Sequence, residues 1–284
     1  MGAEETKTTA LPEAAGANVT TEGRSRLSRI LVSPTVLMIS GPVVLIILWE
    51  VSVRCFAQGN FLLPPASTVF QTLWEITLDG TLAANALASL ARVAAGFACA
   101  AIVGIPVGLM MGYYRVIDWS LSGVVNGLRP IPVAAWVPLS IILMGIGERP
   151  AVFLVFLGTV WPILLSTIQG VRSVPKHLLW AALTMGATAP QIFARVILPA
   201  ALPSILTGLR VGVGTAFTCV IVAELIAVRS GLGYLITEAR MLVRSDLVIA
   251  GMIAIGAVGF LLDWVVSRSL GLALRWQEGL VARS

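Results

Sequence analysis

Long apolar runs separated by short polar segments dominate the pattern along this chain. A helix needs about 20 apolar residues to cross a hydrocarbon core of about 30 Å. Six runs approach that length, over residues 34–54, 87–112, 121–146, 150–171, 202–227 and 247–268. Prolines interrupt the third run and the fourth, and freed backbone groups at membrane depth are tolerated mainly inside protein or beside a water-filled cavity. The pattern predicts an all-α membrane protein with six transmembrane helices that form a conduit.

Other segments have helical spacing that points to packing or to the membrane surface. The stretches LLPPASTVFQTLWEITLDG and GLGYLITEARMLV are too short and too polar to span, which predicts interfacial helices. In the second run, Gly104, Gly108 and Gly112 repeat at every fourth position. Small residues on one face predict that another helix approaches closely there.

Composition agrees with a membrane location. Hydrophobic residues make up 57% of the chain and charged residues 12%, with a mean hydropathy of +0.94, whereas a soluble domain is roughly 25% charged. Residues 29–284 therefore form one membrane domain, and residues 1–28, rich in Ala, Thr, Glu and Gly, are expected to be a disordered tail. We attribute the net charge of +5 to loops that face anionic lipid rather than to nucleic-acid binding.

The distribution of basic residues predicts the orientation. Arg24, Arg26 and Arg29 precede the first run, so the positive-inside rule places the N-terminus in the cytoplasm. Six crossings then place the loops 113–120 and 172–201 and the C-terminus inside, together with Arg115, Arg172, Lys176, Arg195, Arg268, Arg275 and Arg283. The outer stretch 57–91 has no Lys or Arg at all. Three arginines in the last outer loop, Arg229, Arg240 and Arg244, weaken the count.

Residues for catalysis or metal binding are not evident in the sequence. Cys55, Cys99 and Cys219 are scattered, and His177 has no ligand-type residue at a suitable spacing. Neither HExxH nor GxxxxGK[ST] occurs. We therefore expect no catalytic residue, no metal site and no ATP hydrolysis by the chain itself.

The loop LLWAALTMGATAPQIFARVILPAALP predicts two short helices outside the lipid. Ser173 and Thr188 each stand two residues before a proline, a pattern that favours a helix start, and Gln191 completes a capping box with Thr188. Gly186 is expected to end the first helix and Pro199 the second. Both helices are too apolar for a free loop, which indicates a protein contact.

The same loop carries a resemblance to a known family. Ala181-Ala182, Gly186 and Ile197-Leu198-Pro199 are spaced as in the EAA loop of permease subunits of bacterial ATP-binding-cassette (ABC) importers. The stretches SLARVAAGF, LPSILTGLRVGVGTAF and VAELIAVRSGLGYLITEAR are similar to the nitrate, taurine and aliphatic-sulfonate subgroup, and the resemblance covers nearly the whole chain after the tail. It implies the type I importer fold in a bacterial inner membrane.

The resemblance also implies partners. The coupling loop would dock in a groove of a cytosolic ATPase, through Trp180, Ala181, Ala182, Met185, Gly186, Ile197, Leu198 and Pro199. Trp180 replaces the family's usual glutamate; we predict that it anchors in the groove, and the alternative is packing against its own bundle. ATP and magnesium would be bound by two ATPase copies and no cofactor by this chain. A second permease copy, in a homodimer or a heterodimer, and an extracytoplasmic binding protein would complete the importer.

Polar and aromatic residues within the runs are candidates for the translocation path. They are Arg129, Trp136, Trp161, Thr215, Thr218 and Glu224. Alternatively, Arg129 extends to the membrane surface, Glu224 pairs with Arg229, and Asp263 pairs with Arg268. The expected cargo is a small anion such as a sulfonate, taurine, nitrate or bicarbonate. The alternatives are a thiamine precursor or a riboflavin-like heterocycle, or an ion-coupled secondary transporter, although no inverted repeat is evident.

Overall fold

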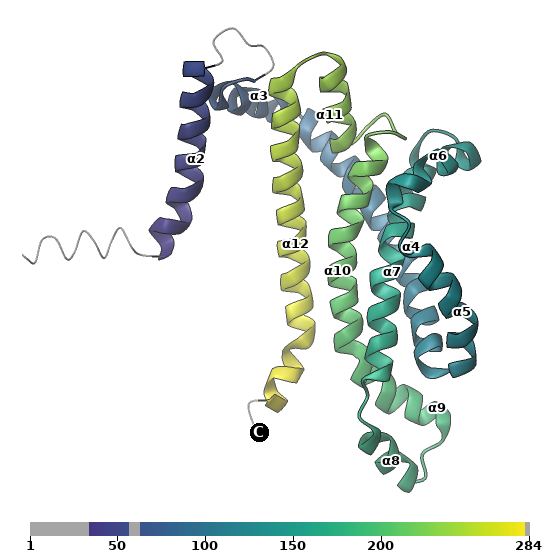
Figure 1. Cartoon of the computed structure of the whole chain (residues 1–284). Helices are drawn as coiled ribbons and strands as arrows, with labels where there is room; N and C mark the ends of the chain where they lie inside the picture. Colours follow the sequence, from purple (N-terminus) through teal and green to yellow (C-terminus); the bar gives the residue numbers. More distant parts are fainter. Residues whose placement is uncertain (1–33, 57–62, 282–284) are drawn as a thin grey trace, which may run out of the picture. The chain divides into compact units, whose positions relative to one another are not determined.

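The computed structural model describes residues 34–56 and 63–281, with side chains over 40–55 and 63–269. The chain divides into two compact units, residues 1–58 and 59–284. In the first unit the described part is helix α2 (Pro34–Phe56), which covers the first expected span (Figure 1). The tail predicted over residues 1–28 lies outside the described residues.

The second unit is helical throughout its described part, as expected for an all-α membrane protein. Its helices are α3 (Ala66–Leu78), α4 (Thr81–Tyr113), α5 (Arg115–Leu128), α6 (Val133–Met144), α7 (Glu148–Arg172), α8 (Lys176–Thr184), α9 (Ala189–Ile192), a π-helical turn (Phe193–Ile197), α10 (Leu198–Glu224), α11 (Leu232–Met241) and α12 (Ser245–Val281). Four helical stretches are long and apolar enough to span a membrane, or five if α5 and α6 form one broken span. The described residues therefore support a multi-pass protein but do not confirm the count of six.

The third expected span is broken. α5 and α6 meet at an angle of 96°, and the break at residues 129–132 contains Pro130 and Pro132. Proline has no backbone N–H and disfavours the helical conformation of the residue before it, so two prolines this close end a helix. The predicted interruption of the third run is therefore confirmed at Pro130 and Pro132. The predicted interruption of the fourth run is wrong, because α7 continues through Pro162.

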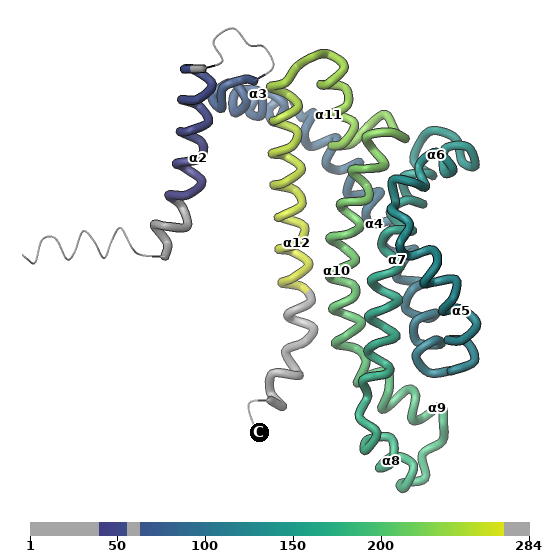
Figure 2. The backbone as a smooth tube through the Cα atoms, in the orientation of Figure 1, coloured from purple at the N-terminus to yellow at the C-terminus, as the bar shows by residue number. Residues whose placement is uncertain are grey.

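α7 lies between α4 and α10 and forms the centre of this unit (Figure 2). The glycine repeat of α4 faces it: a Cβ added at Gly108 would lie 2.7 Å from the Cβ of Thr167, and one at Gly112 would lie 2.6 Å from the Cβ of Val171. Any larger residue would push the two helices apart. The predicted close approach is confirmed, and its partner is α7.

The two ends of α7 separate the two sites described below. The helix has 25 residues and is therefore about 37 Å long. Figure 1 shows α8 and α9 beyond its C-terminal end, and α6 and α11 near its N-terminal end. We call the end of α7 near α8 and α9 the hairpin end, and the end near α6 and α11 the clamp end.

Candidate functional site

The turn between α8 and α9 has the local geometry that its sequence predicts. Gly186 has φ of +75°, which a glycine adopts without strain, and the N–H of Ala187 donates back to the carbonyl of Ala182 at 3.0 Å. Thr188 is the residue that precedes α9, and its N–H donates to the side chain of Gln191 at 2.9 Å. The predicted ending at Gly186 and the predicted cap at Thr188 are both confirmed.

Two other local predictions for this loop are wrong. Ser173 does not begin α8: its hydroxyl donates to the carbonyl of Gly170 at the end of α7, and Pro175 is the residue before α8. Pro199 does not end the second helix, because α9 continues through the π-helical turn into α10 without a break up to Glu224. A π turn uses i→i+5 hydrogen bonds, and this wider turn ends two residues before Pro199, which has no N–H to donate.

One side of the hairpin packs on the ends of the long helices. Val171, Val174, Ile192 and Ile197 are buried together with Ala201 and Ile205. Phe193 also stacks edge-on against Tyr113 at the end of α4, with ring centroids 5.3 Å apart. The packed side of the hairpin therefore contacts the ends of α4, α7 and α10 directly through apolar side chains.

The other side of the hairpin exposes large apolar side chains. Trp180 is 66% exposed and Met185 86% exposed, and Leu178 and Leu183 also belong to this surface. We call these four residues the α8 face. Ala181, Gly186, Leu198 and Pro199 are exposed nearby, whereas Ala182 is partly buried and Ile197 is buried in the packed side. Trp180 does not fill the core of its own described chain, and its docking on a partner stays a prediction.

The clamp end contains a buried arginine that the sequence reasoning overlooked. Arg92 of α4 is 2% exposed, and all five of its N–H donors find acceptors. Its Nη1 lies 2.6 Å from a carboxylate oxygen of Glu224 and 2.9 Å from the carbonyl of Ser230. Its Nε and Nη2 each donate to one oxygen of Glu148 at 2.6 Å, and Nη2 also donates to the hydroxyl of Ser230.

Glu224, at the end of α10, is fully enclosed and also fully bonded. One oxygen accepts from Arg92, and the other accepts from the Ser89 hydroxyl and the Gly233 N–H, each at 2.9 Å. Gly231 has φ of +106°, and a Cβ there would overlap the Glu224 carboxylate. Glycine is therefore required where the chain between α10 and α11 passes over the carboxylate.

These contacts join α4, α7 and α10 to the loop after α10 and, through the Gly233 N–H, to α11. We call Arg92, Glu148, Glu224, Ser89 and Ser230 the Arg92 clamp. The alternative that Glu224 pairs with Arg229 is wrong, because Glu224 pairs with Arg92 and Arg229 is exposed. Glu224 is turned into the protein, so we leave it out of the proposed path. An arginine three turns into an apolar helix is costly unless it is paired, and this signal in SLARVAAGF could have identified Arg92.

The remaining path candidates lie on several elements. Thr218 on α10 is exposed and Thr215 is half-buried, and their hydroxyls donate to the carbonyls of Gly214 and Val211 within their own helix. Arg210 lies on the same helix and is exposed; the sequence reasoning did not consider it. α10 therefore carries three polar side chains over residues 210–218, of which Arg210 and Thr218 are exposed.

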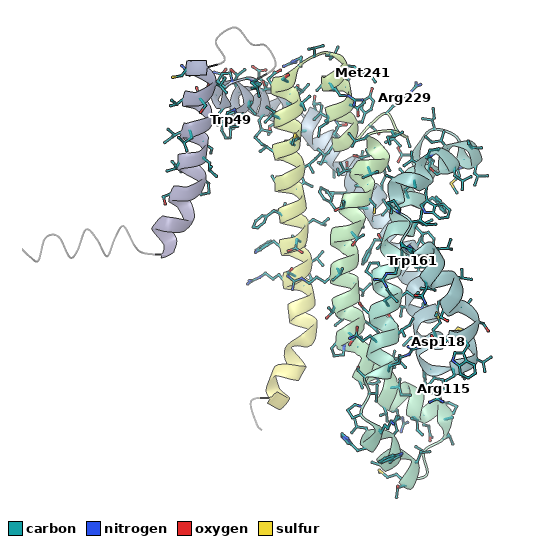
Figure 3. All side chains as sticks on the ribbon, viewed as in Figure 1. Trp49, Arg115, Asp118, Trp161, Arg229 and Met241 are labelled. Atoms are coloured by element: carbon teal, nitrogen blue, oxygen red, sulfur yellow. The ribbon has the colours of Figure 1, made fainter. Side chains whose placement is uncertain are left out.

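No described contact joins the other path candidates, Arg129, Trp136 and Trp161, to these residues of α10. Arg129 is exposed at the break between α5 and α6. Trp136 packs, partly buried, against a cluster from α6, α7 and α10. Trp161 of α7 packs against clusters that include residues of α4 and α5 (Figure 3 labels Trp161). Asp263 and Arg268 on α12 are both exposed, and no ion pair joins them among the residues described.

The comparisons with known proteins now identify the class. Residues 104–269 match the family model described as "Binding-protein-dependent transport system inner membrane component". This match covers more than half of the chain. The chain therefore belongs to the family of binding-protein-dependent ABC transporter permeases.

Individual proteins agree with this assignment. A provisionally named ABC transporter permease protein of Methanocaldococcus jannaschii is 44% identical over 233 residues, 80% of this chain and 87% of the relative. The taurine transport system permease protein of Escherichia coli is 37% identical over 226 residues, 78% of this chain and 82% of the relative. A crystal structure of an amino acid ABC transporter has a similar fold, with a TM-score of 0.59 at 17% identity, over 72% of this chain and 97% of that chain.

Proposed function

We propose that this permease carries a small anion across a bacterial inner membrane, driven by ATP hydrolysis on a partner ATPase that docks on the α8 face. The single observation that carries the docking proposal is the exposure of Trp180, Leu183 and Met185 on a hairpin whose other side packs on three long helices. Large apolar side chains that stay exposed beside a packed core are typical of a protein interface. A tryptophan at the centre of such a surface is the residue type that most often dominates binding energy.

The packing behind the α8 face supports a coupling role. A partner that pulls or pushes on Trp180 moves α8, and Leu179 and Ala182 of α8 pack against the cluster that includes Val171 and Ile197. Displacement is then passed to α7 and α10, because these contacts are apolar and close. We propose that Arg210, Thr215 and Thr218 of α10 contribute to the path, with Arg129 as a further source of positive potential.

The names of relatives support the proposed cargo. They include permeases for taurine, nitrate, aliphatic sulfonates and bicarbonate. All of these solutes carry a negative charge or an oxyanion group. Arg210 is an exposed cation on α10, and Arg129 is an exposed cation at the break between α5 and α6. Exposed arginines favour an anion electrostatically and disfavour a cation.

Membership of the family supports a proposal for the rest of the assembly. We propose two permease copies around one path, two ATPase subunits that bind ATP and magnesium at the hairpin end, and an extracytoplasmic binding protein at the clamp end. Both termini of the chain then face the cytoplasm, in agreement with Arg172, Lys176 and Arg195 at the hairpin end.

Co-purification followed by transport tests the proposal. The chain is co-expressed with the ATPase and the binding protein of its own operon, purified through a tag on the permease, and reconstituted in liposomes. We expect stoichiometric ATPase in the complex and uptake of radiolabelled taurine or sulfonate that requires both ATP and binding protein. Uptake driven by an ion gradient without any ATPase would instead establish a secondary transporter.

A further inference from the structure

A basic cavity lies at the hairpin end, away from the α8 face. It has a volume of about 430 Å³ and is formed where α4 ends, α5 begins and α7 ends. Its lining includes Tyr113, Arg115, Asp118, Trp119 and Arg172. We call it the Arg115 cavity, and Figure 3 labels Arg115 and Asp118 at this end of α5.

The charges in the Arg115 cavity favour an anion. Arg172 forms an ion pair with Asp118 at 2.6 Å, so these two charges offset each other. Arg115 is exposed and has no ion pair or side-chain hydrogen bond to any residue in the described part of the chain. One guanidinium is therefore left over in a cavity that already contains a second, and a guanidinium is well suited to bidentate binding of a phosphate group.

The position of the cavity favours a lipid over a soluble anion. Two helices that are long and apolar enough to span, α4 and α7, both end at it, at Tyr113 and Arg172, so it lies at a membrane–water boundary. On the adjoining turn of α5, Trp119 is 75% exposed and Val116 is also exposed. A soluble anion gains nothing from exposed apolar side chains beside its site, whereas an acyl chain does.

We propose that the Arg115 cavity binds the phosphate headgroup of an anionic phospholipid, with the acyl chains along Val116 and Trp119. Arg115 donates to the phosphate oxygens, and Arg172 contributes positive charge while it stays paired with Asp118. Basic pockets between membrane helices are a known setting for such headgroups. The site requires only that α4 and α7 span the membrane, so it does not depend on ATPase docking or on the identity of the cargo.

Native mass spectrometry of the purified full-length chain tests this proposal. The protein is titrated with phosphatidylglycerol and, separately, with phosphatidylcholine of the same acyl chains. We expect tighter binding of phosphatidylglycerol in the wild type, and about fivefold weaker binding after Arg115→Gln. Arg115→Lys keeps the charge and should retain most of the preference. Arg268→Gln removes an exposed arginine outside the cavity and should leave the preference unchanged.

Three results would overturn the lipid site. The first is equal phosphatidylglycerol binding in the wild type and Arg115→Gln. The second is binding of glycerol 3-phosphate, which lacks acyl chains, as tightly as phosphatidylglycerol, since the site would then be one for a soluble anion. The third is a loss of the dimer after Arg115→Gln with lipid binding unchanged, since the cavity would then be a contact between two copies.

Discussion

The two ends of α7 hold sites of opposite character. At the clamp end, Arg92 and Glu224 are 2% and 0% exposed, and the N–H groups of one and the oxygens of the other are all hydrogen-bonded. At the hairpin end, Trp180 and Met185 are largely exposed and apolar, with no described partner for their outer surface. One site is complete within the chain, and the other exposes an apolar surface that we propose a second protein covers.

The difference teaches how a coupling element can be built. An enclosed charge is tolerated only where several helices hold their groups in fixed positions, so the Arg92 clamp fixes α4, α7, α10 and α11 relative to one another. An exposed apolar surface contributes free energy only when a partner covers it. A chain with an enclosed clamp and an exposed apolar surface can bind a partner at the hairpin end while the helices at the clamp end keep their relative positions.

The largest effect is expected from removing the arginine of the clamp. Arg92→Met leaves the Glu224 carboxylate buried without its cation, which typically costs about 3–5 kcal/mol. For a chain of this size we expect the melting temperature of the purified protein to fall by about 10 °C. Thermal unfolding in detergent, followed by tryptophan fluorescence, measures the shift.

The double variant Arg92→Met with Glu224→Leu separates the clamp from a general packing effect. It removes both charges, so it should be more stable than Arg92→Met alone, because no unpaired buried charge remains. If the double variant is the less stable of the two, the ion pair is not the reason that Arg92 is needed.

At the hairpin end a substitution should change binding and leave stability unchanged. Trp180→Ala removes an exposed anchor of the α8 face, so the melting temperature should stay within about 2 °C of the wild type. Affinity for the ATPase should fall by about thirtyfold, which corresponds to about 2 kcal/mol for a hot-spot residue. Co-purification and ATP-dependent uptake measure the loss.

Met241→Ala is the matched control for the tryptophan. Met241 is also exposed and apolar, at 74%, but it lies at the C-terminal end of α11, near the clamp end, where Figure 3 labels it. ATPase affinity should be unchanged in this variant. Equal losses in both variants would mean that exposed apolar area in general, and not the α8 face, holds the ATPase.

The connection between the two ends is tested on the α4–α7 contact. Gly108→Ala places a methyl group against Thr167 and should destabilise the chain by about 1–3 kcal/mol, with a melting temperature about 5 °C lower. Gly123→Ala on α5 meets open space and should be neutral or slightly stabilising, because alanine favours a helix. An unchanged melting temperature in Gly108→Ala would show that the two helices can separate freely.

The hairpin was more predictable from sequence than the clamp, for a physical reason. Gly186 and the Thr188–Gln191 pair act within a few residues, so their local chemistry decides the turn. Arg92 and Glu224 are 132 positions apart, and no local sequence pattern predicts their contact. Pro199 was misinterpreted because the π turn that accommodates it depends on packing of Ile197 against the long helices. The family motif named the loop but contained no information on these neighbours.

The smallest effect is expected from the exposed arm of the clamp. The side chain of Glu148 is 65% exposed although both of its oxygens bind Arg92, so solvent and salt screen this pair. Glu148→Gln should therefore cost less than about 1 kcal/mol, so the melting temperature should fall by less than about 4 °C. The fall should shrink as salt is raised from about 50 mM to about 1 M, because the Debye length is only about 3 Å at 1 M. Glu238→Gln on α11, an exposed glutamate of the same end, is the control for charge alone. A fall in melting temperature as large as that of Arg92→Met, and independent of salt, would contradict this prediction. It would mean that Glu148, like Glu224, belongs to the enclosed part of the clamp.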